Sequence, residues 1–233
     1  MGKRIIQQAR GKGSLTYRSK KKAFKLTISY PTLEGNAVVE KLMNVPCYSA
    51  PVAKIKIDNK IFYNLAAENI CEGQEINIGK NAKISPGNIV FLKDIPIGTE
   101  IFNLETKPGT GPKLVRTSGT TARVTKKDIK GIYVQLPSKK EKIFNPNVRA
   151  TVGSVAAGGR HEKPILKAGK MFHMKRAIGS CIYPRTSAVK MNVIDHPFGS
   201  GRGKRIKRKI PKRNAPPGKK VGLLRPRRTG KRK

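Results

Sequence analysis

Two adjacent side chains, Asp195 and His196, have the chemistry of an acid–base pair, because a carboxylate can orient an imidazole for proton transfer. They lie in the stretch Met-Asn-Val-Ile-Asp-His-Pro-Phe-Gly-Ser-Gly, residues 191–201. Neighbours in a chain seldom orient each other in this way, and no nucleophile accompanies them. We therefore rank an enzyme centred on this pair last, expect no catalytic residue, and favour a polar turn packed against a partner.

Metal chemistry is also disfavoured. The chain has three cysteines and three histidines, at Cys47, Cys71, Cys181, His161, His173 and His196. None of the cysteines has CxxC spacing, and an odd, scattered set predicts neither a disulfide framework nor a zinc site. We expect no metal site, no cofactor, and thiols in or near the core of a protein from a reducing compartment.

Phosphate chemistry is better represented. Residues 116–123, Arg-Thr-Ser-Gly-Thr-Thr-Ala-Arg, combine hydroxyls and two guanidiniums around a glycine, and such a turn can donate hydrogen bonds to phosphate oxygens. An ordinary polar hairpin explains this motif equally well. Residues 153–161 are small and basic, which allows either close backbone approach or, in isolation more simply, a flexible linker. Residues 214–222 contain prolines that exclude a regular helix and favour extended chain on a surface.

The charge identifies the class of partner. Lys and Arg number 51 against 13 Asp and Glu, a formal net charge of +38. Residues 1–33 and 196–233 carry nine and sixteen basic side chains and no acid, whereas 34–105 has a net charge of −2 and 106–195 one of +15. A basic tail can also be a solubility or localisation tract, but long arms at both ends favour binding to a polyanion, above all nucleic acid. No apolar run approaches the ~20 residues of a membrane span, and a small-molecule substrate is not indicated.

The elements that must position these groups are strands. Apolar and polar residues alternate with a period of two, which predicts half-buried strands. The runs fall into two sets, 24–30, 52–57, 61–65 and 75–79, then 101–105, 113–117, 120–124, 131–136 and 142–144. Asp58-Asn59-Lys60 is a suitable hairpin turn. We predict two small barrels, the first of oligonucleotide-binding type, with little helix. Because aromatic residues make up only 6%, we expect recognition of RNA backbone and shape.

Taken in order, these segments resemble the universal large-subunit ribosomal protein two family, in its archaeal/eukaryotic-type form. The resemblance covers essentially the whole chain. Its most specific motifs lie at 95–99 (Ile-Pro-Ile-Gly-Thr), 107–109, 118–120, 149–153 (Arg-Ala-Thr-Val-Gly), 162–164, 167–170, 191–199 and 213–218 (Arg-Asn-Ala-Pro-Pro-Gly).

The resemblance implies a mainly β fold, an oligonucleotide-binding-like barrel followed by an SH3-like barrel with long irregular basic extensions at both ends. The implied boundaries are a basic arm at 1–33, a first barrel at 34–85 whose first strand lies at about 24–30, a second barrel at 86–160, and a threading extension at 161–233. It implies a structural, non-enzymatic constituent of the large ribosomal subunit. Its site would lie near the peptidyl-transferase centre, and it would support subunit association in the cytoplasm.

The implied partners are large-subunit rRNA, neighbouring ribosomal proteins and the small subunit, with no membrane and with Mg²⁺ only as part of the rRNA environment. His196 would hold rRNA near the catalytic centre. We expect the near-neutral 34–105 block to face solvent most. The candidate rRNA-binding residues are Arg116, Thr117, Ser118, Thr120, Arg123, Arg149, Arg160, Lys163, Lys167, Lys170, Asn192, Asp195, His196, Arg213, Asn214, Lys219, Arg227 and Arg228.

One segment departs from the family pattern. At Ser187-Ala188 the family usually has an Arg-Gly pair, and Lys190 replaces a small residue. One guanidinium contact of the family is therefore missing, and Lys190 can supply charge nearby. The alternative function from the residues alone is a general nucleic-acid-binding or RNA-chaperone protein that acts by charge.

Overall fold

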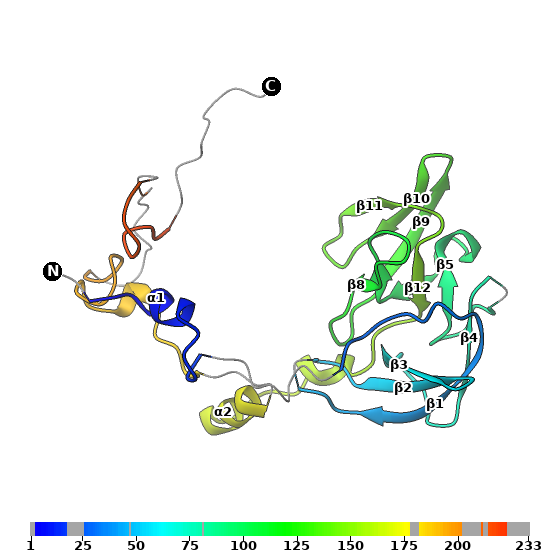
Figure 1. The fold of residues 1–233 in the computed structure, drawn as a ribbon, viewed down its shortest axis with the longest axis horizontal. Helices are drawn as coiled ribbons and strands as arrows, with labels where there is room; N and C mark the ends of the chain where they lie inside the picture. Colours follow the sequence, from blue (N-terminus) through cyan, green and yellow to red (C-terminus); the bar gives the residue numbers. More distant parts are fainter. Residues whose placement is uncertain are drawn as a thin grey trace. The chain divides into compact units, whose positions relative to one another are not determined.

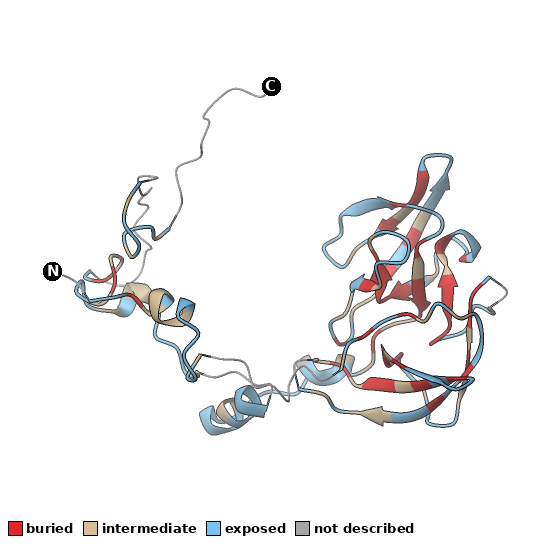
Figure 2. Ribbon diagram, in the orientation of Figure 1, coloured by how far each residue is buried: buried red, intermediate tan, exposed pale blue. Residues whose placement is uncertain are grey.

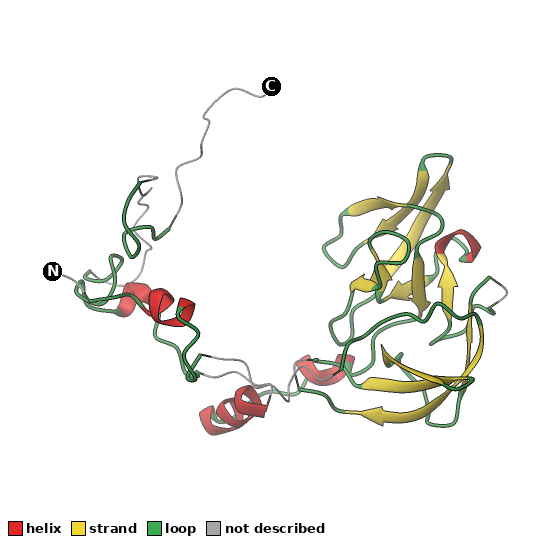
Figure 3. Ribbon diagram, viewed as in Figure 1, coloured by secondary structure: helices red, strands yellow, loops and turns green. Residues whose placement is uncertain are grey.

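A computed structural model describes residues 3–17, 26–46, 48–80, 82–177, 182–201, 211 and 214–222. The chain divides into two compact units. The larger one, residues 20–171 and 177–179, contains all the strands of the described chain, and the other combines residues 1–19, 172–176 and 180–233 (Figures 1 and 3). Each unit is described by itself.

The first barrel is built from four strands whose alternating residues point inward. They are β1 (Gly35–Met43), β2 (Val52–Ile57), β3 (Lys60–Leu65) and β4 (Glu75–Ile78). β1 pairs antiparallel with both β2 and β4, and β2 pairs with β3. The predicted turn joins β2 to β3, with Asp58 at a φ of +49°, a backbone conformation that Asp tolerates. The inward side chains, among them Val39, Ile55 and Ile76, form one buried cluster.

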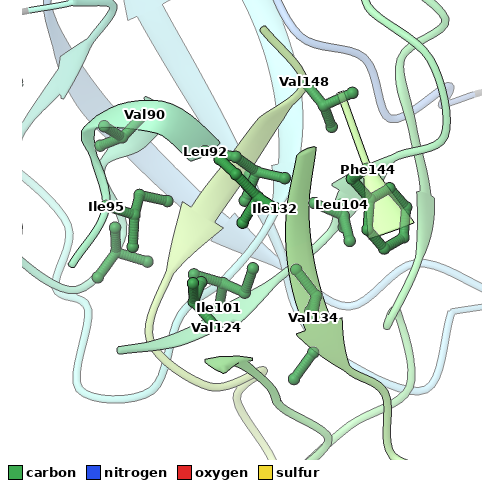
Figure 4. Close-up of a cluster of buried hydrophobic side chains, with 13 residues drawn as sticks. Val90, Leu92, Ile95, Ile101, Leu104, Val124, Ile132, Val134, Phe144 and Val148 are labelled. Atoms are coloured by element: carbon green, nitrogen blue, oxygen red, sulfur yellow. The ribbon is translucent and has the colours of Figure 1, made fainter. Parts of the chain in front are cut away.

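The second barrel follows directly. Its strands are β5 (Ile89–Phe91), β6 (Glu100–Phe102), β7 (Leu104–Glu105), β8 (Pro112–Leu114), β9 (Ala122–Asp128), β10 (Gly131–Gln135), β11 (Glu141–Phe144) and β12 (Arg149–Val152), with a short 3₁₀ turn η2 (Leu92–Asp94). Thirteen buried side chains fill its centre, and Figure 4 shows how Leu92, Ile101 and Val134 converge there with Phe144.

Both barrels belong to one continuous sheet. Its strand order is β11-β10-β9-β6-β12-β5-β4-β1-β2-β3, and β7 and β8 form a separate pair. The barrels join where β4 and β5 pair in parallel at Ile78 and Ile89. A third buried cluster, including Val52 and Leu65 from the first barrel and Phe102 from the second, seals the junction. Figure 2 shows the buried residues concentrated in these strands. The mainly β, two-barrel fold is therefore confirmed.

Helices are short, as the absence of long 3.6-residue periodicity predicted. They are α1 (Ile6–Gly11), α2 (Ala168–Ala177), and the 3₁₀ turns η3 (Gly158–His161) and η4 (Ala188–Lys190). Among the described residues, no helix has the length and apolar character needed to cross a membrane.

The predicted strand at 24–30 was wrong in its described part, 26–30. Ile28 and Tyr30 do point inward, as the alternation required, but the segment makes a single backbone hydrogen bond to β3, from Ser29 to Tyr63 at 3.2 Å, instead of a ladder. Pro31 follows and cannot donate a backbone hydrogen bond. β1 takes the place of this strand in the sheet.

The cysteine prediction also needs correction. Cys71 is exposed and free rather than in or near the core. Cys47 and Cys181 lie outside the described residues.

Candidate nucleic-acid interface

The Arg116–Thr120 turn lies against residues 155–158 at the seam between the two barrels. Gly119 donates a backbone hydrogen bond to the oxygen of Val155 at 2.9 Å, and Val155 donates to the oxygen of Thr120 at 3.3 Å. The backbones are so close that a Cβ on Gly119, where φ is +70°, would lie 2.5 Å from the Cα of Gly158. Residues 116–120 and 155–158, which are far apart in the sequence, therefore form one surface. We call this surface the seam turn.

Residues 155 and 156 also reach the first barrel. Val155 forms a β-bridge with Ala67, and Ala156 donates to the oxygen of Ala66 at 3.0 Å. The linker interpretation of residues 153–158 is thus wrong, because this segment is fixed to both barrels.

Two polar atoms of the seam turn are buried without a hydrogen-bond partner in the described structure. The Arg116 guanidinium lies over the Tyr48 ring at 5.6 Å and donates from Nη1 to the oxygen of Pro112 at 3.3 Å, but its Nε has no partner. Ser118 donates its backbone N–H to Ser49 Oγ at 3.1 Å, yet its own Oγ is unpaired. Unpaired buried polar atoms are costly, and both of these atoms are shielded from solvent inside the turn.

The two threonines of this turn differ in hydrogen bonding and in exposure. Thr120 Oγ1 donates to the oxygen of Thr117 at 2.6 Å, which closes the turn. Thr117 is exposed, while Thr120 is half-buried. Tyr48 and Ser49 of the first barrel contact this turn through the Arg116 guanidinium and the Ser118 N–H. They could not be predicted from the sequence, because they lie outside any strand-like alternation.

The other two guanidiniums of the barrels have acidic partners. Arg123 in β9 pairs with Glu100 at 3.2 Å, and both side chains are about half exposed. Arg149 pairs with the fully buried Glu105 at 3.2 Å, donates to the oxygen of Pro31, and lies over the Tyr30 ring at 5.3 Å. With only 14% of its side chain exposed, Arg149 is fixed inside the protein. Arg149 therefore has a structural role in the second barrel, and its rRNA contact stays a prediction.

A row of exposed cations continues from the seam turn. Arg160 lies in η3, and Lys163 and Lys167 follow before Lys170 in the first turn of α2; all four are exposed. Helix α2 has no buried residue and carries Lys175 and Arg176 in its last turn. A helix that buries none of its own side chains is not stabilised by a core, which is typical of a segment that packs on a partner.

The second unit holds the Asn192–Gly199 turn. The backbone N–H groups of Asp195 and His196 both donate to the oxygen of Asn192, at 3.1 and 3.2 Å. His196 is 3% exposed, and its Nδ1 accepts the backbone N–H of Phe198 at 3.0 Å. Asp195 pairs with Lys3 at 3.6 Å. The carboxylate and the imidazole therefore have separate partners, and the geometry that motivated the enzyme interpretation is not present.

The remaining candidate residues are either exposed or lie outside the described residues. Asn192, Asn214 and Lys219 are exposed. At the departure from the family pattern, Lys190 is exposed in η4 and lines a hollow of about 510 Å³ together with Thr186, Asn192 and Asp195. Three predicted contacts, Arg213, Arg227 and Arg228, lie outside the described residues. Among the described residues, no group of three metal-ligating side chains comes together.

Two small barrels, a seam turn between them and a row of exposed cations define a basic protein whose surface suits a polyanion. Comparison with known proteins identifies which one. Residues 85–216 match the family model of Ribosomal Proteins L2, C-terminal domain. Full-length relatives named large ribosomal subunit protein uL2 include those of Archaeoglobus fulgidus, 43% identical over 238 residues, and Methanothrix thermoacetophila, 45% identical over 237 residues; both alignments cover 100% of each chain.

The chain belongs to the uL2 family of large ribosomal subunit proteins. It is a structural, rRNA-binding component of the large subunit that acts in translation together with rRNA and other ribosomal proteins, and it is not an enzyme.

Proposed function

We propose that the chain is a primary rRNA-binding protein near the peptidyl-transferase centre that supports association of the subunits. The observation that carries the proposal is the row of exposed cations, Arg160, Lys163, Lys167 and Lys170, which continues from the exposed Thr117 of the seam turn. Phosphate oxygens and ribose hydroxyls accept hydrogen bonds from these exposed side chains, and such contacts fix the register of a protein on folded RNA. Mg²⁺ enters only with the rRNA, and no cofactor is required.

In this proposal, the second barrel and the basic segments have different roles in binding rRNA. The second barrel anchors the chain through the seam turn, while the basic segments neutralise phosphates deeper in the RNA. In the Asn192–Gly199 turn, the buried His196 ring holds the turn in shape, and the exposed Asn192 reaches the rRNA. The proximity to the peptidyl-transferase centre and the role in subunit association rest on the family resemblance of this turn. The near-neutral block of residues 34–105, with nine acids against seven basic side chains, faces solvent most.

The experiment compares binding of the full chain to large-subunit and small-subunit rRNA at equal salt. We expect a clear preference for large-subunit rRNA, which Arg116→Ala reduces by roughly tenfold because a charge-assisted contact is lost. Lys113→Ala, an exposed cation on β8 outside the seam turn, serves as control and leaves the preference unchanged. Equal binding to both RNAs, weakened alike by both variants, would support the charge-only RNA chaperone instead.

A further inference from the structure

Three described segments of the smaller unit, at residues 3–8, 193–197 and 216–219, surround a hollow. Residues 3–5 and Gln8 line one side, residues 193–194 and Pro197 a second, and residues 216–219 a third. Its volume is about 390 Å³, within the ~300–1,000 Å³ range of sites for small organic groups. We call it the terminal hollow.

The N-terminal segment holds the walls of the terminal hollow in place. Lys3 donates its backbone N–H to the oxygen of Ile194 at 2.9 Å, and Ile5, 6% exposed, is the one buried apolar side chain of this unit among the described residues. Gln8 accepts the N–H of Ile5 at 3.1 Å, and its amide lies so near Gly218 that a Cβ there would be 3.3 Å from Oε1. Residues 3–8 therefore lie against both Ile194 and Gly218.

The walls combine apolar and cationic surfaces. Val193 and Ile194 are 62% and 53% exposed, although they are large apolar side chains beside an almost fully buried histidine. Pro216 and Pro217 face the same space. Exposed apolar side chains that line a concave surface mark a binding site, because a partner that covers them removes apolar area from water.

The charges indicate which partner. Arg4 and Lys219 line the terminal hollow, no acid lines it, and neither cation has an ion pair among the described residues. Asp195 is the only acid after Glu162 in the sequence, and Lys3 pairs with it. An apolar wall bordered by cations matches the two halves of a nucleotide, a base face and a phosphate.

We infer that the terminal hollow receives an unpaired nucleotide of rRNA, with its base against Val193, Ile194 and the two prolines and its phosphate near Arg4 and Lys219. The inference rests on the proposed function, since it assumes that this unit meets rRNA. It goes further in assigning shape-specific recognition to a part of the chain that charge alone would describe as a phosphate-neutralising thread.

The test places a photoreactive benzoylphenylalanine at Val193 in the full chain and crosslinks purified large subunits that contain it. We expect crosslinks concentrated on one rRNA nucleotide. The matched control carries the probe at Leu15, which is 84% exposed in the same unit but does not line the terminal hollow, and it should not reach that nucleotide. If the probe at Val193 blocks incorporation, Pro217 carries it instead.

A second measurement uses chemical probing of that base. Val193→Ser with Ile194→Ser should raise its reactivity several-fold, while Leu15→Ser leaves it protected. Crosslinks from Val193 to a protein, or a base that stays equally reactive in all chains, would overturn the inference. The proposed function fails separately, if the unaltered chain is absent from washed large subunits.

Discussion

Arg149 is a cation that stabilises the interior of the second barrel. Its guanidinium and its backbone N–H both contact the buried Glu105 carboxylate, and Glu105 also accepts the N–H of Gly111 at 3.1 Å. The pair joins the end of β7 to the start of β12 beside Tyr30. From sequence alone, this arginine could not be distinguished from one that faces rRNA, because the distinction depends on a carboxylate 44 residues away.

Arg149→Ala should lower the free energy of unfolding by about 3–5 kcal/mol, because it leaves a buried carboxylate without its counter-ion. Arg123→Ala is the matched control. It breaks the exposed pair with Glu100, and such pairs contribute about 0–1 kcal/mol. Urea unfolding of the two full-length variants measures both, and equal, small effects would contradict the structural role of Arg149.

The Tyr30 hydroxyl lies at the seam between the barrels. It donates to the oxygen of Asn103 and lies 2.8 Å from Thr151 Oγ1, while Asn64 Nδ2 donates to the same Thr151 oxygen at 3.3 Å. Burial raises the pKa of this phenol well above its ordinary value of 10.0. The folded state therefore keeps the proton at a pH where the unfolded chain loses it.

Since the folded pKa of Tyr30 is the higher one, its contribution to stability is complete below pH 10 and is lost as the pH rises further. Urea unfolding between pH 8 and about 11 should show this decline. Tyr30→Phe should cost about 1–2 kcal/mol near neutral pH, through the lost hydrogen bonds, but should decline less steeply in alkali. Parallel curves for both chains would show that Tyr30 is not responsible.

The positions of most strands could be predicted from the sequence, but the contacts between segments that are distant in the sequence could not. The alternation in residues 52–57 and 131–136 located β2 and β10 within a residue, because one face of each is buried. β1 was missed because its alternation of apolar and polar residues is short. Gly35 and Asn36 stand at its start, and Glu40 and Lys41 interrupt it. At the site, the Arg116–Thr120 turn was recognised by its composition, but its contact with Gly158 depends on packing between distant segments.

That contact makes Gly119 the most sensitive position of the seam turn. Gly119→Ala should lower the free energy of unfolding by about 1–2 kcal/mol from the left-handed backbone and by roughly another 1–3 kcal/mol from the clash with Gly158. Gly109→Ala is matched in backbone, with a φ of +75° and open space around its Cβ, and should show only the first cost. Urea titration of both variants provides the comparison. Equal losses would mean that the two segments are not in close contact.

For the whole molecule, the net charge of +38 is best understood through its distribution over the chain. Residues 34–105 contain nine of the thirteen acids, and the second barrel contributes the seam turn, from which the cationic row continues. The acid-free ends supply most of the residues that line the terminal hollow, and Val193 and Ile194 complete it. Folded RNA is the partner that matches all three features, since it offers dense phosphate, a defined shape and unpaired bases.

The most direct test of this account is sedimentation of the tagged full chain with large ribosomal subunits after a high-salt wash. Contacts made by charge alone weaken steeply with salt, whereas buried polar contacts and shape recognition persist. The account predicts that the chain stays with the large subunit, at one copy per particle, and is absent from the small subunit. Release of the chain into the wash, or its equal distribution over both subunits, would contradict it.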